Sequence, residues 1–208
     1  TGSPMAEVLR VNMEKINNSS ILDTLNLKTN KYILLSAHRE ENIDIEQNFF
    51  ELMNAINVMA EDYQIPIIYS LHPRSRNFIK KRGFKFHELV RTLEPFGFSD
   101  YISLQQNSLC VVSDSGTLAE ESASLHFPAV SIRTSTERPE AIDKGSFVIG
   151  SISSYSILQA VKMSISMFEN NELIQDVPDY KDENVSVKVV KIIQSYVDII
   201  NKKVWNKS

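Results

Sequence analysis

From Lys31 onward, short runs of apolar and β-branched residues alternate with longer segments of helical spacing. This alternation is typical of a parallel β-sheet whose strands are joined by crossover helices. Several runs are apolar almost throughout, as strands buried on both faces are. The expected strands are Tyr32 to Ser36, Pro66 to Leu71, Leu89 to Leu93, Leu109 to Ser113, Ala129 to Ile132 and Phe147 to Ile149. The pattern therefore predicts an α/β fold with a Rossmann-like parallel sheet of about six strands and helices on both faces.

The segments between the strands are predicted to be helices. From Ile45 to Tyr63, apolar residues recur three and four positions apart, so this segment should form an amphipathic helix that packs on the sheet. Further helices are expected at Arg74 to Arg82, Asp100 to Asn107, Thr117 to Leu125, Pro139 to Lys144 and Tyr155 to Glu169.

The two ends differ from the middle of the chain. Residues 1–30 are expected to form an interdomain crossover and a leading helix, because Thr1-Gly2-Ser3-Pro4 looks like a turn into a helix. Residues 31–183 form the predicted Rossmann-like domain. In residues 184–208, apolar residues recur at helical spacing, so a final helix should pack against this domain or against a missing one. We expect the chain to begin within a longer protein.

Composition excludes several classes of function. The chain has 208 residues, with 22 Lys and Arg against 26 Asp and Glu. Its net charge is therefore negative, which does not favour binding to nucleic acid or to an anionic membrane. Cys110, the only cysteine, excludes an internal disulfide and a multi-cysteine zinc site, and its apolar neighbours indicate a buried, unreactive thiol. No sequence pattern of a membrane span or signal peptide is present, so a cytoplasmic location is expected.

The first candidate site follows the first predicted strand, where open α/β sheets bind ligands. In Ser36-Ala37-His38-Arg39-Glu40-Glu41-Asn42, His38 is a candidate hydrogen-bond donor or proton-transfer group for a diphosphate, and Arg39 a charged partner. The alternative is a surface turn with solvated charges. The segment also matches the H-x-E pattern of zinc deaminases, but the cysteine pair that those enzymes require is absent.

The second candidate, Leu71-His72-Pro73-Arg74-Ser75-Arg76, follows the second predicted strand. It would shape the floor of the site or simply cap the next helix, and the sequence leaves both open.

The third candidate, Val112-Ser113-Asp114-Ser115-Gly116-Thr117, joins an apolar strand to a helix. Ser115, Gly116 and Thr117 would lie at a helix N-terminus, where backbone N–H groups and the helix dipole favour a phosphate. Glu121, about one turn further, would accept hydrogen bonds from two ribose hydroxyls. An ordinary serine N-cap is the alternative. The segment is neither a Walker loop nor a G-x-G-x-x-G fingerprint, so neither ATP hydrolysis nor NAD binding is supported.

The fourth candidate, residues 132–140, is rich in charged groups and again lies between a strand and a helix that begins at a proline. Arg133 or Arg138 would clamp phosphate oxygens, with Glu137 and Glu140 holding those arginines in place. An exposed salt-bridged loop is the alternative.

Taken together, the segments resemble the second domain of the non-hydrolysing UDP-N-acetylglucosamine 2-epimerases. That domain carries a Ser-Ala-His-Arg-x-Glu-Asn segment, an Asp-Ser-Gly segment ending in Glu-Glu, and a Thr-Glu-Arg-Pro-Glu segment, and this chain has all three in order. The resemblance extends over nearly the whole chain. Residues 133–140 look closest to the branch that acts in UDP-N-acetyl-L-fucosamine synthesis for surface polysaccharides such as capsule and lipopolysaccharide.

The resemblance implies one half of a two-domain fold like that of GT-B glycosyltransferases. It places His38 beside the diphosphate, Ser115, Gly116 and Arg133 at the phosphates, Glu121 at the ribose, and Tyr101 near the uracil. Two residues depart from the family pattern: Thr117 replaces a usual second glycine, and Phe96 replaces a common glutamine. These departures concern the local contacts to the phosphates and the base.

The implied reaction inverts C2 of a UDP-activated acetamido sugar by elimination and re-addition of UDP, with no cofactor and no metal. The proton-transferring carboxylates of the family come mainly from the N-terminal domain, so the isolated chain should bind UDP without turning over substrate. A homodimer of the full-length protein is also implied. Two alternatives remain: the donor-binding domain of a GT-B glycosyltransferase, and a non-catalytic module that binds nucleotide sugars.

Overall fold

The computed structural model describes residues 1–133, 138–172 and 176–207. Within these ranges, six strands form a single sheet in the order β3-β2-β1-β4-β5-β6, and all neighbouring strands are parallel. The strands are β1 (Ile33–Ser36), β2 (Ile67–Ser70), β3 (Val90–Leu93), β4 (Cys110–Ser113), β5 (Ala129–Ile132) and β6 (Val148–Gly150). The predicted α/β fold with a Rossmann-like sheet is confirmed, and the predicted strands differ from the observed ones only at their ends.

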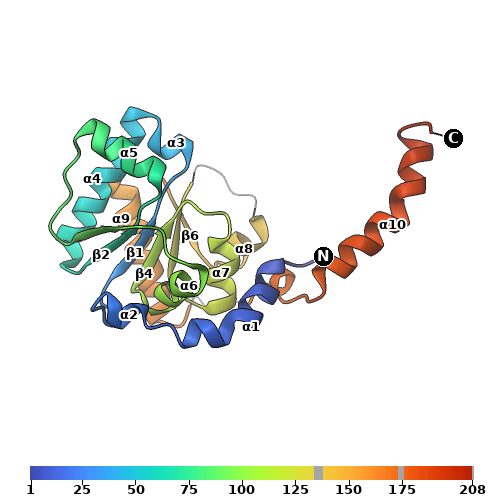
Figure 1. Ribbon diagram of the computed structural model, residues 1–208, viewed down its shortest axis with the longest axis horizontal. Helices are drawn as coiled ribbons and strands as arrows, with labels where there is room; N and C mark the ends of the chain where they lie inside the picture. The colour runs from blue at the N-terminus through green and yellow to red at the C-terminus, as the bar shows by residue number, and fades with distance from the viewer. Residues whose placement is uncertain (134–137, 173–175, 208) are drawn as a thin grey trace.

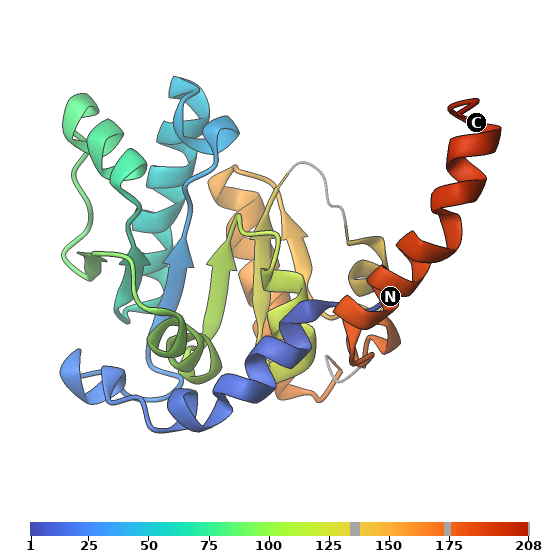
Figure 2. The same cartoon turned by 45° about the vertical axis from the view of Figure 1, so that its right-hand side comes forward.

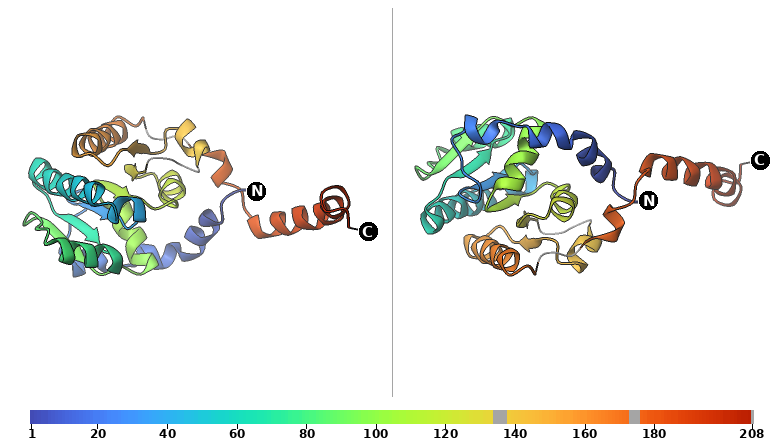
Figure 3. Two further views of the ribbon diagram at one scale, coloured as in Figure 1. Left: turned by 90° about the horizontal axis from the view of Figure 1, so that it is seen from above. Right: turned by 90° about the horizontal axis from the view of Figure 1, so that it is seen from below.

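Helices cover both faces of the sheet, as Figure 1 and the end-on views in Figure 3 show. One face is covered by α4 (Glu46–Tyr63), α5 (Pro73–Arg82) and α9 (Ser154–Glu169). The core on this face includes Ile33 and Leu35 of β1. Because side chains alternate along a strand, Leu34 points to the other face, where it packs beneath the remaining helices. The sheet is therefore buried on both sides, which explains its apolar strands.

The second face is covered by α6 (Phe98–Asn107), α7 (Leu118–Leu125) and the short α8 (Pro139–Asp143). Outside them lies α1 (Pro4–Asn17), which packs on α6 and α7 through Leu9, Ile16 and Ile102. The N-terminal segment thus belongs to the same folded body as the sheet.

Three short helical elements were absent from the expectations drawn from sequence. They are α2 (Ile21–Thr24), α3 (Glu40–Ile43) and the 3-10 helix η1 (Pro178–Tyr180). Each is only about one turn long, so it is too short to show an apolar periodicity in the sequence. The α3 turn adjoins the first candidate site, because it begins at Glu40, directly after Ser-Ala-His-Arg, and Arg39 is its N-cap residue.

The final helix, α10 (Val185–Lys203), projects away from the body of the molecule (Figure 2). Only Val185 is buried, and the apolar side chains further along it are exposed. Of the two expected alternatives, the structure does not show the helix packed against its own domain, and packing against a missing domain stays a prediction. No helix in the described ranges has both the length and the apolar character required to span a lipid bilayer.

Candidate functional site

The crossover connections from β1 and β4 diverge, which opens a crevice at the carboxyl end of the sheet. These strands are neighbours, with Leu35 paired to Val112 and Ser36 to Ser113, yet β1 leads toward β2 and β4 toward β5 on opposite sides. A reversal of this kind is the usual ligand-binding position in open α/β sheets. A cavity of about 230 Å³ lies here, lined by Ser36, His38, Ser70, His72, Pro95, Phe96, Tyr101 and Ser115.

A second hollow of about 460 Å³ adjoins the first. The two share His38 and His72, whose rings lie 5.4 Å apart between centroids. The remaining lining residues of the second hollow are Arg39, Glu40, Glu41 and Arg74. The site therefore consists of two connected compartments, with the two histidines at their junction.

His72 performs both functions that the sequence left open. Its Nδ1 accepts a hydrogen bond from the backbone N–H of Arg74, so it caps α5, and its ring also lines both compartments. The guanidinium of Arg74 pairs with Asp44 at 2.6 Å and with Glu40 at 2.8 Å. Arg74 therefore ties α5 to the loop after β1 and fixes one wall of the site.

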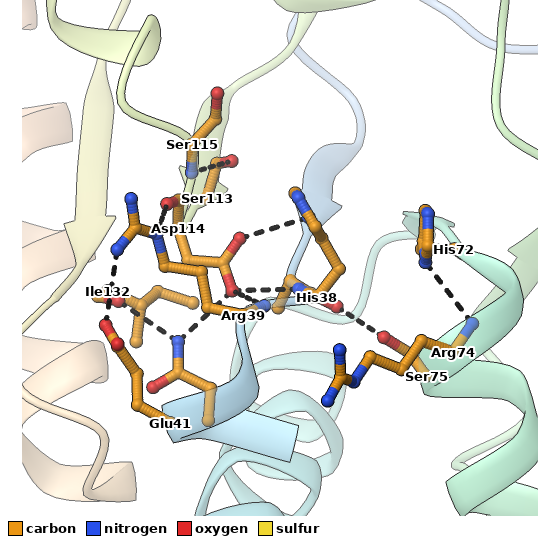
Figure 4. A network of polar contacts seen from close by, with 12 residues as sticks. His38, Arg39, Glu41, His72, Arg74, Ser75, Ser113, Asp114, Ser115 and Ile132 are labelled. Atoms are coloured by element: carbon orange, nitrogen blue, oxygen red, sulfur yellow. Dashed lines mark hydrogen bonds and ion pairs between the residues drawn. The ribbon is translucent and has the colours of Figure 1, made fainter. Parts of the chain in front are cut away.

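The loop that carries His38 is held by Asp114, as Figure 4 shows. Asp114 is fully buried, and its Oδ2 accepts hydrogen bonds from the backbone N–H groups of His38 and Arg39, each at 2.8 Å. The amide of Asn42 also donates to Oδ2, at 3.2 Å. His38 Nδ1 lies 3.3 Å from Oδ1 of the same carboxylate. One side chain from the end of β4 thus positions the residues that follow β1.

Arg39 lies beside this network. Its Nε donates to the backbone oxygen of Asp114 at 2.9 Å, and its guanidinium lies 3.6 Å from the carboxylate of Glu41. Its side chain is about one-third exposed and lines the second compartment. The predicted cationic partner of His38 is therefore in the site.

The N-terminus of α7 faces the crevice. Its N-cap residue is Thr117, whose side chain makes no capping hydrogen bond to the helix among the described residues. Ser115 does not act as a serine cap; its hydroxyl lies 3.0 Å from that of Thr117, and its N–H donates to the hydroxyl of Ser113. The first-turn amides and the positive end of the helix dipole are thus available to an anion.

Arg133 brings a full positive charge to the same helix end. It is only 7% exposed, and its Nη1 lies 3.5 Å from the position that a Cβ on Gly116 would occupy. Among the described residues, its buried Nε has no hydrogen-bond partner. A buried guanidinium with an unused donor beside an uncapped helix N-terminus fits a phosphate ligand.

Glu121 lies deeper, one turn into α7. It is buried, and the side-chain amide of Gln105 donates to its Oε2 at 2.6 Å. Burial raises the pKa of Glu121 above its ordinary value, and hydrogen bonds from Gln105 and Thr117 act against that rise. Burial also raises the pKa of Tyr101, to which the nearby charge of Glu121 adds. Tyr101 lines the first compartment, whereas Glu121 is not among the residues that line it, although its charge acts on the tyrosine.

Arg138 makes a contact that the sequence did not predict. Its Nε donates to Glu120 at 2.7 Å, and Glu120 also accepts from the hydroxyl of Ser3, which ties the start of the chain to α7. Glu140 was expected to hold an arginine; the hydrogen bond to Glu120 is the main cause that raises the pKa of Arg138, and the charge of Glu140 adds to it. The carboxylate of Glu140 also accepts a hydrogen bond from the hydroxyl of Tyr180. Neither compartment is lined by Arg138. Glu137, the other expected partner, lies outside the described residues.

Three residues of this network, Asp114, Asn42 and Gln105, had no role predicted from the sequence. Asp114 had a usable signal, since an ionisable residue directly after an apolar strand lies at the ligand-binding edge of a parallel sheet. Asn42 and Gln105 act through contacts with distant segments, and their positions along the chain carry no comparable signal.

These features define a Rossmann-like domain with a crevice at its topological switch point, where Arg133 and the first-turn amides of α7 are candidates for binding an anion. A family model described as UDP-N-acetylglucosamine 2-epimerase matches residues 1–194. The chain belongs to the UDP-N-acetylglucosamine 2-epimerase family. The resemblance seen in the motifs is thereby confirmed at the level of the family, and the members of this family are isomerases.

Individual relatives agree with this assignment. A UDP-N-acetylglucosamine 2-epimerase from Methanococcus maripaludis is 33% identical over 139 residues, which cover 65% of this chain and 38% of that protein. A putative one from Thermotoga maritima is 28% identical over 199 residues, which cover 93% of this chain and 52% of that protein. The chain thus spans about half the length, or less, of the curated relatives it matches.

Solved structures show the same relation. The UDP-N-acetylglucosamine 2-epimerase from Rickettsia bellii is 38% identical, with a TM-score of 0.81, covering 99% of this chain and 55% of that one. The enzyme from Neisseria meningitidis, solved with bound UDP-GlcNAc, is 26% identical, with a TM-score of 0.75, covering 94% of this chain and 54% of that one. The chain is therefore similar in fold to one half of these enzymes.

Proposed function

We propose that this chain is the UDP-binding half of an epimerase that inverts C2 of a UDP-activated 2-acetamido sugar. One observation carries the proposal: the guanidinium of Arg133 lies beside Gly116 at the N-terminus of α7, at the switch point of the sheet, and the N-cap residue of that helix makes no capping bond. His38 lies at the adjoining cavity. Membership of the epimerase family and the Neisseria relative solved with UDP-GlcNAc support uridine diphosphate as the anion.

The diphosphate binds where donors converge. Its oxygens accept from the first-turn amides of α7, from the hydroxyl of Ser115 and from the guanidinium of Arg133. Gly116 leaves room beside Arg133 for a phosphate. The uracil lies near Tyr101, and the ribose hydroxyls donate to Glu121. The proposal includes three further substrate-binding residues: Arg39, Thr117 and Arg138. Of these, Arg138 lines neither compartment.

The reaction begins when a base removes the C2 proton of the sugar while the bond between C1 and the diphosphate oxygen breaks. The products are a 2-acetamidoglycal and UDP. Addition of UDP to the glycal, with a proton delivered to the opposite face of C2, gives the epimer. The charge that develops on the departing diphosphate is stabilised by Arg133 and the α7 dipole. His38 shares its Nε2 proton with the departing oxygen and recovers it during re-addition.

The base is proposed to come from an N-terminal domain of the same protein, in a two-domain arrangement like that of GT-B enzymes. Support comes from the length of the relatives, because this chain covers only about half of each of those sequences. The exposed apolar residues of α10 also support it, because a helix that leaves Ile192, Tyr196 and Val197 in water leaves a large apolar area to be buried. We propose that this helix packs on the N-terminal domain, and that the full-length protein is a homodimer.

The substrate is proposed to be the UDP-acetamido sugar of the UDP-N-acetyl-L-fucosamine branch, which serves surface polysaccharides. The ground is the sequence Arg133-Thr134-Ser135-Thr136-Glu137-Arg138-Pro139-Glu140. A relative from Pseudomonas aeruginosa, 30% identical over 134 residues, is named a UDP-2,3-diacetamido-2,3-dideoxy-D-glucuronate 2-epimerase, so the family includes more than one sugar. Turnover of UDP-N-acetylglucosamine in preference to the 6-deoxy sugars would contradict this assignment.

A chimera tests the reaction. The N-terminal half of the Rickettsia bellii epimerase, joined ahead of Thr1, supplies the proposed base, and proton NMR of the product reports the configuration at C2. We expect inversion with solvent deuterium at C2, no turnover by the isolated chain, and loss of turnover with His38→Ala. A chimera that binds UDP and transfers the sugar to an acceptor without inversion would favour a glycosyltransferase. Turnover by the isolated chain would contradict the proposal that the base comes from the N-terminal domain.

A further inference from the structure

The two oxygens of the Asp114 carboxylate have different surroundings. Oδ2 accepts three hydrogen bonds, from the backbone N–H groups of His38 and Arg39 and from the Asn42 amide. The same Asn42 amide donates to the backbone oxygen of Ile132, which fixes its orientation. Because three N–H donors point at Oδ2, that oxygen is held as an acceptor and the carboxylate cannot rotate without breaking them.

Oδ1 is buried and has no hydrogen-bond partner among the described residues. The ring nitrogen Nδ1 of His38 lies 3.3 Å away from it. A buried carboxylate oxygen without a donor is costly, and a small rotation of the partly exposed imidazole closes the bond. Hydrogen bonds at active sites are often long or poorly aligned until substrate is bound.

We propose that Asp114 is a positioning residue that holds a proton on Nδ1 of His38 and thereby leaves Nε2 as the nitrogen that exchanges protons in the site. The assignment of Nε2 to the diphosphate rests on the proposed function, whereas the assignment of the Nδ1 proton rests on the geometry of Asp114 alone. Asp114 contacts His38 in two ways, because its Oδ2 accepts a hydrogen bond from the backbone of that residue and its Oδ1 lies 3.3 Å from the ring nitrogen Nδ1.

Two other histidines provide an internal contrast. In His72 and in His87, Nδ1 accepts a hydrogen bond from the backbone N–H two residues later. A neutral ring whose Nδ1 accepts carries its proton on Nε2. The structure thus assigns opposite tautomers to His38 and to this pair.

Long-range 15N–1H correlation spectra of the chain, labelled with 15N-histidine and recorded at alkaline pH where imidazoles are neutral, distinguish the tautomers directly. Substitution of each histidine in turn assigns the signals. We expect the neutral proton on Nδ1 for His38 and on Nε2 for His72 and His87. A His38 ring protonated mainly on Nε2 in the same spectrum would overturn the proposal, whatever the activity of the protein.

Asp114→Asn provides a second test. The three donors at Oδ2 select the amide oxygen for that position, so the amide NH2 faces the ring and Nδ1 must become the acceptor. We expect the His38 proton to move to Nε2 in a variant that remains folded by circular dichroism. The exposed Asp198→Asn on α10 is the control and should leave every histidine signal unchanged. If Asp114→Asn does not fold, the wild-type spectrum still decides.

In the chimera, Asp114→Asn should lower kcat by roughly 10²-fold to 10⁴-fold, the range of general acid–base catalysis, while the UDP dissociation constant changes by less than about threefold. Equal losses in kcat and in UDP affinity would indicate a purely structural residue and overturn the positioning role. A wild-type chimera that binds UDP but never epimerises would contradict the proposed function, and the tautomer spectra would still decide the role of Asp114.

Discussion

The guanidinium of Arg133 lies 3.5 Å from the point where a Cβ on Gly116 would stand, and among the described residues, its two chain neighbours aside, no other atom lies within 4 Å of that point. Within the described part of the chain, an added methyl group would therefore meet only ordinary van der Waals contact. It would occupy the space between the α7 amides and the arginine, where the phosphate is proposed to bind.

Gly116→Ala should therefore weaken UDP binding without unfolding the protein. We expect the UDP dissociation constant to rise about tenfold, a change of about 1.4 kcal/mol, and the free energy of unfolding to change by less than about 0.5 kcal/mol. Calorimetric titration and urea denaturation measure the two quantities. Unchanged UDP affinity in Gly116→Ala would place the phosphate elsewhere.

Glu121 should make the stability of the chain depend on pH. Its pKa in the folded state is raised above the ordinary value of 4.5, chiefly by burial. The folded state therefore binds more protons than the unfolded state between these two pKa values, and stability falls as pH rises through this window. The slope from one group is at most about 1.4 kcal/mol per pH unit.

Glu121→Gln removes this ionisation. The free energy of unfolding of the variant minus that of the wild type should become more positive from pH 4.5 upward and level off above the folded-state pKa. Urea denaturation at a series of pH values measures the difference. Parallel curves for the two proteins would show that Glu121 does not titrate in this way.

The helix α10 should contribute little to the stability of the domain from which it projects. Of its residues, only Val185 is buried, where its N–H donates to Glu7 and its side chain approaches Gly2. A chain that ends after Ser186 keeps these contacts and loses the exposed apolar residues. We expect the free energy of unfolding to change by less than about 1 kcal/mol and self-association in sedimentation to decrease.

A large loss of stability on this truncation would instead mean that α10 packs against the sheet domain in solution. The full chain, measured at the same concentration, is the control, because it has the same sheet domain and differs only in keeping the exposed helix α10.

The sequence allowed the sheet and its main helices to be predicted because each leaves a local pattern. Buried parallel strands are continuous apolar runs, and α4 repeats its apolar residues every three or four positions. The partner of α10 could not be predicted, because an apolar helical face predicts that some surface covers it but not which one.

The site was predictable in its location and less so in its contacts. His38, Ser115 and Tyr101 share one cavity because parallel strands end at one edge. The hydrogen bond from the His38 backbone to Asp114 joins residues 76 positions apart, and the one from Arg138 to Glu120 joins residues 18 apart. Such pairings depend on the three-dimensional path of the loops, and this path cannot be predicted from charge and spacing along one sequence.

The most direct test of the account is a calorimetric titration of the chain with UDP, with ADP and GDP as controls for the base. Because half of a cleft binds weakly, we expect a UDP dissociation constant of about 0.1–1 mM. Ser115→Ala and Arg133→Ala should each weaken it, by about threefold to tenfold and by more than tenfold respectively. Their matched controls, Ser195→Ala on α10 and Arg10→Ala on α1, should leave it unchanged. Equal binding of the three nucleotides, or UDP affinity that survives Arg133→Ala, would contradict a uridine-diphosphate site at the start of α7.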